Sequence, residues 1–245
     1  MNVHVTLATA ARVLRQLRRD PRTIALLMLV PVLLVTLLKY VFAGQEPVFQ
    51  RIAGPMLGLF PLISLFLVTS ITMLRERVSG TLERLMAMPI AKLDLLLGYG
   101  IAFALVAAVQ ATFVSLVAIR LLGLDLPRSA WQVVALAIGN AVLGMALGLF
   151  VSAFARSEFQ AVQFMPGFIL PQIFLCGLFV AREDMARPLE LLSYALPLTY
   201  AYDALDRVTR AGDLGHAFWL DVAIVVGATL VALGLGAATL RRRTP

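Results

Sequence analysis

The chain has 245 residues, of which 60% are hydrophobic and 14% are charged, and its mean hydropathy is +0.90. Soluble domains average roughly 25% charged residues, so this composition excludes an ordinary soluble protein and predicts an all-α integral membrane protein with one transmembrane domain over residues 1–245. The net charge of +7 does not require a nucleic-acid partner, because basic residues that flank membrane spans and attract anionic lipids produce the same excess. We expect the bilayer, and no nucleic acid, as a partner.

Residues 3–19 are predicted to form an amphipathic helix on the membrane surface. Apolar residues recur there at spacings of four and three from Val3 to Leu17, while Arg12 and Arg15 occupy another face. Such a helix lies flat in the interface, with its apolar side toward the acyl chains. The alternative is a disordered basic flank.

Six segments are long and apolar enough to be predicted as membrane-spanning helices, since a span needs about 20 residues. They are residues 24–42, 54–74, 93–119, 131–154, 159–180 and 217–240. An even number of spans places both termini on one side, and thirteen of the 21 Lys and Arg residues fall on that side. Because cytoplasmic flanks retain basic residues, we expect a multi-pass protein of the plasma (inner) membrane with both termini in the cytoplasm.

The second predicted span opens with helix-breaking residues. Gly54 and Pro55 begin it and Pro61 follows, so we expect a broken or kinked start at its outer end.

The segment that follows, residues 75–90, concentrates charge between two apolar runs. Its charged residues are of both signs: Arg75, Glu76, Arg77, Glu83 and Arg84. Leu82, Leu85 and Met86 follow at helical spacing and predict an apolar ridge, which suits a groove on a protein better than lipid. Gly80 permits a sharp corner, and Pro89 is expected to end the helix. A merely solvated basic loop is the alternative.

The fourth and fifth predicted spans carry two different polar patterns. The fourth has small or polar residues at intervals of four, namely Asn140, Gly144 and Gly148. This stripe predicts close approach of another helix. The fifth is the most polar and most interrupted, through Gln160, Gln163, Pro166 and Gln172. Polar groups are costly in lipid, so these four should face protein or a water-filled substrate path.

Residues 181–216 are too apolar for a solvated loop and too interrupted to span. Several leucines alternate with Tyr194, Tyr200 and Tyr202. A short re-entrant pair of helices at the outer end fits this composition.

Catalytic and metal-binding motifs are missing from the sequence. His4 and His216 fall on opposite sides of the membrane in this topology, so no paired-histidine metal site is expected. Lys39, Asp94 and Asp221 all fall at span ends, which disfavours an ion-coupled carrier. There is no Gly-x-x-x-x-Gly-Lys-[Ser/Thr] loop and no Gly-x-Ser-x-Gly elbow, so we expect neither an ATPase nor a hydrolase, and no cofactor in this chain.

The chain resembles the permease subunits of type-2 ATP-binding-cassette (ABC) exporters, particularly the daunorubicin-resistance-like drug-efflux branch. Three stretches carry the resemblance: Arg75-Glu-Arg-x-x-Gly80-Thr-Leu-Glu-x-Leu85, Phe174-Leu-x-Gly177-Leu-Phe and Leu196-Pro-Leu-Thr-Tyr200-Ala-x-Asp203-Ala-Leu205. The resemblance extends over essentially the whole chain.

By this resemblance, residues 75–90 are similar to the coupling helix that fits a cleft on a separate ATPase subunit. The implied coupling residues are Arg75, Glu76, Gly80, Thr81, Leu82, Glu83 and Leu85. The partner subunit would bind ATP and Mg²⁺, and two permeases, expected to be a homodimer, would pair with two ATPases.

The predicted function is therefore export of amphiphilic drugs or lipid-like compounds by an ATP-driven transporter. Export of a lipid-linked glycan or another cell-envelope precursor is the alternative within transport. A non-transporting membrane scaffold is the alternative from another class.

Overall fold

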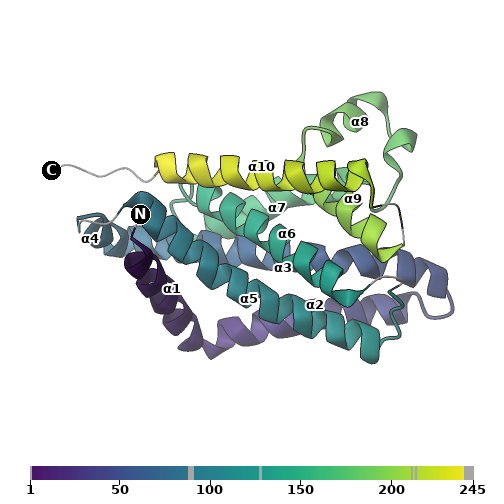
Figure 1. Cartoon of the computed structure of the whole chain (residues 1–245), viewed down its shortest axis with the longest axis horizontal. Coiled ribbons are helices and arrows are strands. Elements are labelled where there is room, and N and C mark those ends of the chain that lie inside the picture. The colour runs from purple at the N-terminus through teal and green to yellow at the C-terminus, as the bar shows by residue number, and fades with distance from the viewer. Residues whose placement is uncertain (1, 88–90, 127–128, 211, 213, 240–245) are drawn as a thin grey trace.

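The computed structural model describes residues 2–87, 91–126, 129–210, 212 and 214–239, and within these residues the chain contains helices and no β-strand (Figure 1). The elements are α1 (Val3–Arg18), α2 (Pro21–Val41), α3 (Glu46–Val78), α4 (Thr81–Ala87), α5 (Lys92–Arg120), α6 (Ala130–Val151), α7 (Glu158–Leu175), the 3-10 helix η1 (Arg182–Asp184), α8 (Arg187–Ser193), α9 (Pro197–Thr209) and α10 (His216–Thr239). The prediction of an all-α protein is confirmed for the described residues.

Five of these helices are long and apolar enough to cross a membrane: α2, α3, Asp94–Arg120 of α5, α6 and α10. The predicted fifth span is α7, which has 18 residues and is not among the five. It ends at Leu175, five residues before the predicted end, because Gly177 with φ of 100° turns the chain. The sixth span therefore stays a prediction, although α7 also runs along the bundle (Figure 1).

The two ends of the bundle differ. One end, which we name the α1 end, holds α1, α4 and the last turn of α10 (Figure 1). The opposite end, which we name the α9 end, holds α8 and α9. At the α1 end, α3 is joined to the last turn of α10, where Arg77 donates to Thr239 at 3.4 Å between Nη2 and Oγ1. The tail arginines lie outside the described residues.

Helix α3 is the longest element, and its bounds differ from those of the predicted second span, residues 54–74. Of the predicted broken or kinked start at Gly54, the break is wrong: the helix begins at Glu46 and continues through Pro55 and Pro61, while a kink stays a prediction. A proline removes one hydrogen bond from a helix, and the surrounding helices hold α3 together across that loss. The end also lies later than predicted, at Val78 instead of Leu74.

Two glycines of α3 allow α9 to pack closely against it. A Cβ atom on Gly54 would lie 2.8 Å from Cβ of Thr209, and one on Gly58 would lie 2.4 Å from Cδ1 of Leu205. Residues that look like helix breakers in the sequence therefore act as a packing surface for a neighbouring helix.

The tightest helix contact joins α3 to α6. A Cβ atom on Gly144 would lie 2.2 Å from the carbonyl oxygen of Leu62, and one on Gly148 would lie 2.5 Å from that of Phe66. Both distances are far inside van der Waals contact, so only glycine fits. This confirms that the small-residue stripe of the fourth predicted span is a packing face.

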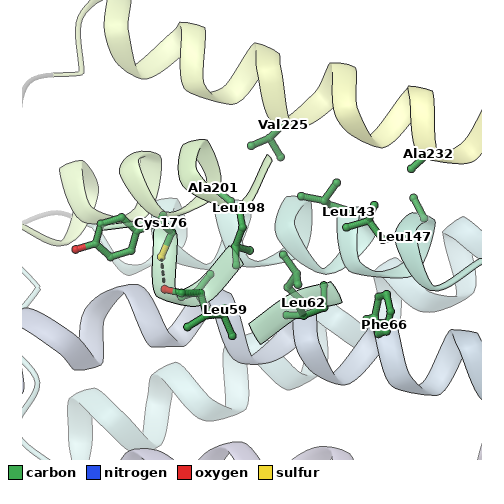
Figure 2. Close-up of a cluster of buried hydrophobic side chains, with 14 of the residues drawn as sticks. Leu59, Leu62, Phe66, Leu143, Leu147, Cys176, Leu198, Ala201, Val225 and Ala232 are labelled. Atoms are coloured by element: carbon green, nitrogen blue, oxygen red, sulfur yellow. Dashed lines mark hydrogen bonds between the residues drawn. The ribbon is translucent and has the colours of Figure 1, made fainter. Parts of the chain in front are cut away.

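A buried cluster surrounds this contact and draws in the helices of the α9 end. Figure 2 shows its members from α3, α6, the end of α7, α9 and α10. They include Leu59, Leu62, Phe66, Leu143, Leu147, Cys176, Leu198, Ala201, Val225 and Ala232. The Cys176 thiol is buried and donates to the Ile173 carbonyl at 3.2 Å. Cys176 therefore packs as a small apolar residue.

Helix α1 is confirmed, but the side that it presents to the protein is not the predicted apolar stripe alone. Thr9, Ala10 and Val13 are buried, whereas Val3 and Leu7 are exposed. Gly98 of α5 permits the contact, since a Cβ atom there would lie 2.5 Å from Cβ of Thr9. The helix is thus docked on α5, and its first apolar residues remain available to lipid.

Helix α2 contains a proline whose effect is compensated by a glutamine. Pro31 has no N–H group, so the carbonyl of Leu27 lacks its usual helical donor. The Gln110 side chain of α5 donates to that carbonyl at 2.8 Å and lies 3.1 Å from Ser64 Oγ of α3. A buried polar group thus joins three helices by satisfying a freed backbone acceptor.

The segment between α7 and α10 contains two short helices, as predicted. Helix α9 packs on α3, α6 and α10, with Leu198, Ala201 and Leu205 buried. Helix α8 projects from the bundle, with Leu189 and Leu191 exposed (Figure 1). Re-entry of this pair into the membrane stays a prediction.

We predict that Gly144→Ala and Gly148→Ala each destabilise the fold, because the added methyl group meets backbone that cannot rotate away. Overpacking of this kind costs about 1–3 kcal/mol. Gly139→Ala is the matched control on the same helix, since a Cβ atom there meets nothing within 4 Å. Thermal unfolding in detergent should show lower midpoints for the first two variants alone, and equal midpoints in all three would contradict this packing.

Candidate coupling site and transport path

The α1 end is shaped by a corner between a long helix and a short one. Helix α3 ends at Val78, and α4 begins at Thr81 after a turn in which Gly80 has φ of 71°. This left-handed conformation favours glycine, so the predicted corner is confirmed. The hydroxyl groups of Ser79 and Thr81 lie 3.0 Å apart beside it.

The structure distributes the predicted coupling residues over both arms of this corner. Arg75 and Glu76 belong to the last turns of α3, while Thr81, Leu82 and Leu85 belong to α4. Glu83 also lies in α4, but its side chain and that of Met86 fall outside the described part of the chain. Pro89, the predicted helix end, lies outside it as well.

Helix α4 turns part of its apolar ridge inward. Leu82 is 6% exposed and belongs to a buried cluster with Met73 and Leu95, and Leu85 packs against the same cluster. The expectation that Leu82 forms part of an exposed docking face is therefore corrected: it anchors α4 to the bundle. Among the α4 side chains that the structure describes, Arg84 and Ala87 are exposed, and Arg84 carries the charge.

Glu76 is buried and lies at the centre of a polar network. It is 5% exposed, and its carboxylate accepts from Arg12 Nη1 of α1 at 2.8 Å. The Tyr99 hydroxyl of α5 donates to the same carboxylate and accepts from Arg12 Nη2 at 2.8 Å. Three helices thus meet through one carboxylate.

The chemistry of this network favours a fixed ion pair. Burial disfavours the charged form of Arg12, but its bonds to Glu76 and Tyr99 outweigh burial and raise the pKa of Arg12 above its ordinary value. A buried carboxylate without a cationic partner would be costly. Glu76 is therefore a residue that holds α1 against α3 and α5, and it does not stand in an exposed loop.

Two further contacts fix the same end. Arg75 forms a bidentate ion pair with Glu158 at the start of α7, at 2.7 Å from Nε and 2.9 Å from Nη2. Both side chains are exposed, so this pair contributes little to stability. The backbone N–H of Asn2 donates to both carboxylate oxygens of Asp94 at 3.1 Å, which joins the start of α1 to the start of α5.

A cavity of about 370 Å³ lies beside the network, under the joint between α1 and α2. Its polar lining includes Asp20, Arg75 and Glu76, and its apolar lining includes Val68 and Phe103. A space of this size with mixed lining can hold part of an amphiphilic molecule.

The polar residues of α7 do not share one face. Gln163 and Gln172 are nine residues apart, which at about 3.6 residues per turn places them on opposite sides. Gln163 is exposed, whereas Gln172 is 2% exposed and donates to the Phe168 carbonyl at 3.0 Å. The structure therefore does not bring the four predicted path residues together.

The remaining two have distinct places. Gln160 lies at the start of α7, where Ser157 accepts from its backbone N–H and its own side chain accepts from the Arg156 N–H at 2.8 Å. This resembles a capping box and explains Gln160 as a helix-start residue. Pro166 is exposed on the side of Gln163 and removes the donor for the Val162 carbonyl.

The sequence was compared with models of known protein families. Residues 4–208 match the family model of the ABC-2 type transporter. The chain belongs to the ABC-2 type transporter family.

Relatives in this family include probable multidrug ABC transporter permeases of Escherichia coli. The permease YbhS is 24% identical over 178 residues, which cover 72% of this chain and 47% of the relative, and YbhR is 26% identical over 156 residues, which cover 62% and 42%. ABC transporter G family member 20 of Dictyostelium discoideum is 26% identical over 145 residues, covering 59% and 20%. The matched region thus spans less than half the length of each relative. Family membership and the apolar helices identify a multi-pass membrane protein and a transmembrane subunit of an ABC transporter.

The sequence does not predict two residues of this ABC-2 family member's polar network. Arg12 falls on the basic face of the predicted first helix, and Tyr99 falls within the predicted span 93–119. A signal existed for Tyr99, because it is the one tyrosine inside residues 93–119 and lies within two turns of the charged end. No pattern in the sequence indicates that Arg12 points toward the bundle.

We predict that the Arg12–Glu76 pair is strongly coupled and that the Arg75–Glu158 pair is not. Loss of one partner of a fully buried pair costs about 3–5 kcal/mol, and an exposed pair contributes roughly 0.2–1 kcal/mol. Arg12 is partly exposed, so Glu76→Gln and Arg12→Met should fall near the lower end of the first range. Double-mutant cycles on chemical unfolding in detergent measure both couplings, with the exposed pair as the matched control. Equal coupling in the two pairs would refute a structural role for the buried network.

Proposed function

We propose that the chain is the permease subunit of an ATP-driven exporter that moves amphiphilic drugs or lipid-like compounds outward across the plasma membrane. The observation that carries this proposal is the corner at Gly80, which belongs to a protein of the ABC-2 type transporter family. In this proposal the α1 end is cytoplasmic, because the basic residues cluster there. A separate ABC ATPase binds ATP and Mg²⁺ and docks on this end.

Coupling would pass through the corner as movement of near-rigid elements. Helix α4 is anchored by Leu82, and the neighbouring turn of α3 is anchored by Glu76 to Arg12 and Tyr99. A push on α4 would therefore move the ends of α1, α3 and α5 together. Arg84 and the exposed Val78 are the described side chains best placed to touch the ATPase.

The transport path is proposed to lie between two copies of the chain, lined by α2, α3 and the exposed side of α7. Gln163 and the backbone freed by Pro166 would be costly against lipid and favourable against water or a second polar surface. Gly167, on the same side, has nothing within 4 Å of an added Cβ atom and leaves room for a neighbour. These features favour a homodimer in which the two α7 helices face a shared space.

We predict that Arg84→Glu weakens the association with the ATPase while membrane insertion is retained, because the side chain is exposed and reverses its charge. The measurement is purification of the tagged protein from its native membrane in mild detergent, followed by quantification of any co-purifying subunit and of its ATP hydrolysis. Arg156→Glu is the matched control at the same end.

Glu76→Ala is not suitable for this purpose, because it removes the partner of Arg12 and Tyr99 and is expected to destabilise the α1 end. Purification of the wild-type protein without an ATPase would refute the permease proposal. If Arg84→Glu and Arg156→Glu retain the ATPase equally, the docking role of α4 is refuted, but the permease proposal is not.

We predict that Gln163→Leu lowers export without lowering the unfolding temperature, because the side chain makes no hydrogen bond to a described residue. Gln172→Leu is the comparison, since it removes a buried amide and should act on stability. The measurement is efflux of an amphiphilic cationic dye from cells, beside the unfolding temperature of each variant. Unchanged efflux in Gln163→Leu would contradict this path. A deletion strain that accumulates a cell-envelope precursor but shows normal dye efflux would instead favour the precursor as the substrate.

A further inference from the structure

A second cavity lies on the lipid side of the joint between α1 and α2. It measures about 230 Å³ and is almost entirely apolar, with walls from α1, α2 and α5. Its apolar lining includes Leu14 of α1, Leu27 of α2, and Leu105 and Val109 of α5. Leu105 and Val109 are more than half exposed, so the cavity opens toward the surface that faces the acyl chains.

Among the described residues that line this cavity, Arg18 is the charged one. Arg18 stands at its rim, on the last turn of α1, and is exposed. It forms no ion pair with any carboxylate in the described part of the chain. The guanidinium group therefore has open donors directly above an apolar space.

The surroundings of Arg18 strengthen its positive potential. Arg15, Arg19 and Arg22 are exposed neighbours within four residues along the chain. Asp20 is the nearest acidic residue in sequence, and its carboxylate accepts from the backbone N–H and the hydroxyl of Thr23, at 3.2 and 2.6 Å. Asp20 also lines the other cavity, on the far side of the joint.

We propose that this cavity is a binding site for one anionic phospholipid of the bilayer. An acyl chain lies in the apolar space between α1, α2 and α5, and the phosphate group accepts hydrogen bonds from Arg18 at the rim. Arginine binds phosphate in a bidentate geometry, and a basic residue at the membrane surface favours an anionic lipid about fivefold. The site would occupy the joint between α1 and α2, and it is independent of the transported substrate and of any ATPase.

The identity of the bound molecule follows from the two parts of the site, the charged rim at Arg18 and the apolar walls. A free phosphate ion would use Arg18 but not the apolar walls, and a zwitterionic lipid would use the walls but place a second, positive group near the arginines. A protein partner would have to enter from the hydrocarbon side, where Leu105 and Val109 face. An anionic phospholipid satisfies both halves.

The test uses fluorescence quenching by brominated lipids in vesicles that contain the purified full chain. Trp131 and Trp219 are first replaced by Phe, and a single probe, Leu105→Trp, is placed at the mouth of the cavity. Leu116→Trp is the matched control probe, because it is an exposed residue of the same helix outside the cavity. Brominated phosphatidylglycerol and brominated phosphatidylcholine are compared in mixed vesicles, with circular dichroism to show that each variant is folded.

We expect the probe at residue 105 to report about a fivefold preference for phosphatidylglycerol, and the probe at residue 116 to report close to none. Arg18→Gln should abolish the preference at residue 105, whereas Arg156→Gln, at the same end but outside the cavity, should retain it. Equal quenching by the two lipids at residue 105 would overturn the proposal. A preference that survives Arg18→Gln, or that Arg156→Gln lowers equally, would also overturn it, because the attraction would then belong to the basic surface as a whole.

Discussion

The arrangement of the α1 end depends on one buried carboxylate. Glu76 cannot be removed from water without partners, and it finds them in Arg12 of α1 and Tyr99 of α5. This requirement selects the position of α1, since a surface helix held only by apolar contacts could slide along α5. The close approach of Thr9 to Gly98 then fixes the position of α1 along α5. Helices α1, α3 and α5 are thus joined at the point where α3 turns into α4, and a displacement of that turn moves all three.

A second constraint acts on the other faces of α3. Glycines bring its backbone against α6 at Gly144 and Gly148, and its own glycines admit α9. In a membrane, where apolar side chains gain nothing by leaving lipid for protein, such close packing is the main source of helix association. Helix α3 is therefore clamped along its length, whereas α2 and α10 remain largely exposed. The hydrogen bond from Gln110 to the Leu27 carbonyl is one of the contacts that join α2 to this centre, beside the apolar packing of Val35.

The sequence predicts those features that depend on composition and local geometry. Hydropathy locates the long helices, a glycine between charged stretches predicts the corner at Gly80, and the spacing of Gly144 and Gly148 predicts a packing face. It does not predict which way a charged residue points. Glu76 and Arg12 are separated by 64 residues in the chain, and only the tertiary fold shows that they pair. The sequence does not predict the continuity of α3 through Pro55 either, because neighbouring helices, and not local propensity, decide whether a proline breaks a helix.

Helix α7 carries polar side chains on two opposite sides, and these bear on what can lie next to each side. Its inward side carries Gln172, whose Oε1 has no hydrogen-bond partner among the described residues, and its outward side carries Gln163 beside a proline that frees a carbonyl. A helix with polar groups on both sides cannot be stable against lipid on one of them. The bundle covers the inward side, and in the proposed arrangement water or another polar surface covers the outward side, where Gln163 would be costly against lipid. This distribution of polar groups is the physical reason why the proposed homodimer places α7 at the shared space between the two copies.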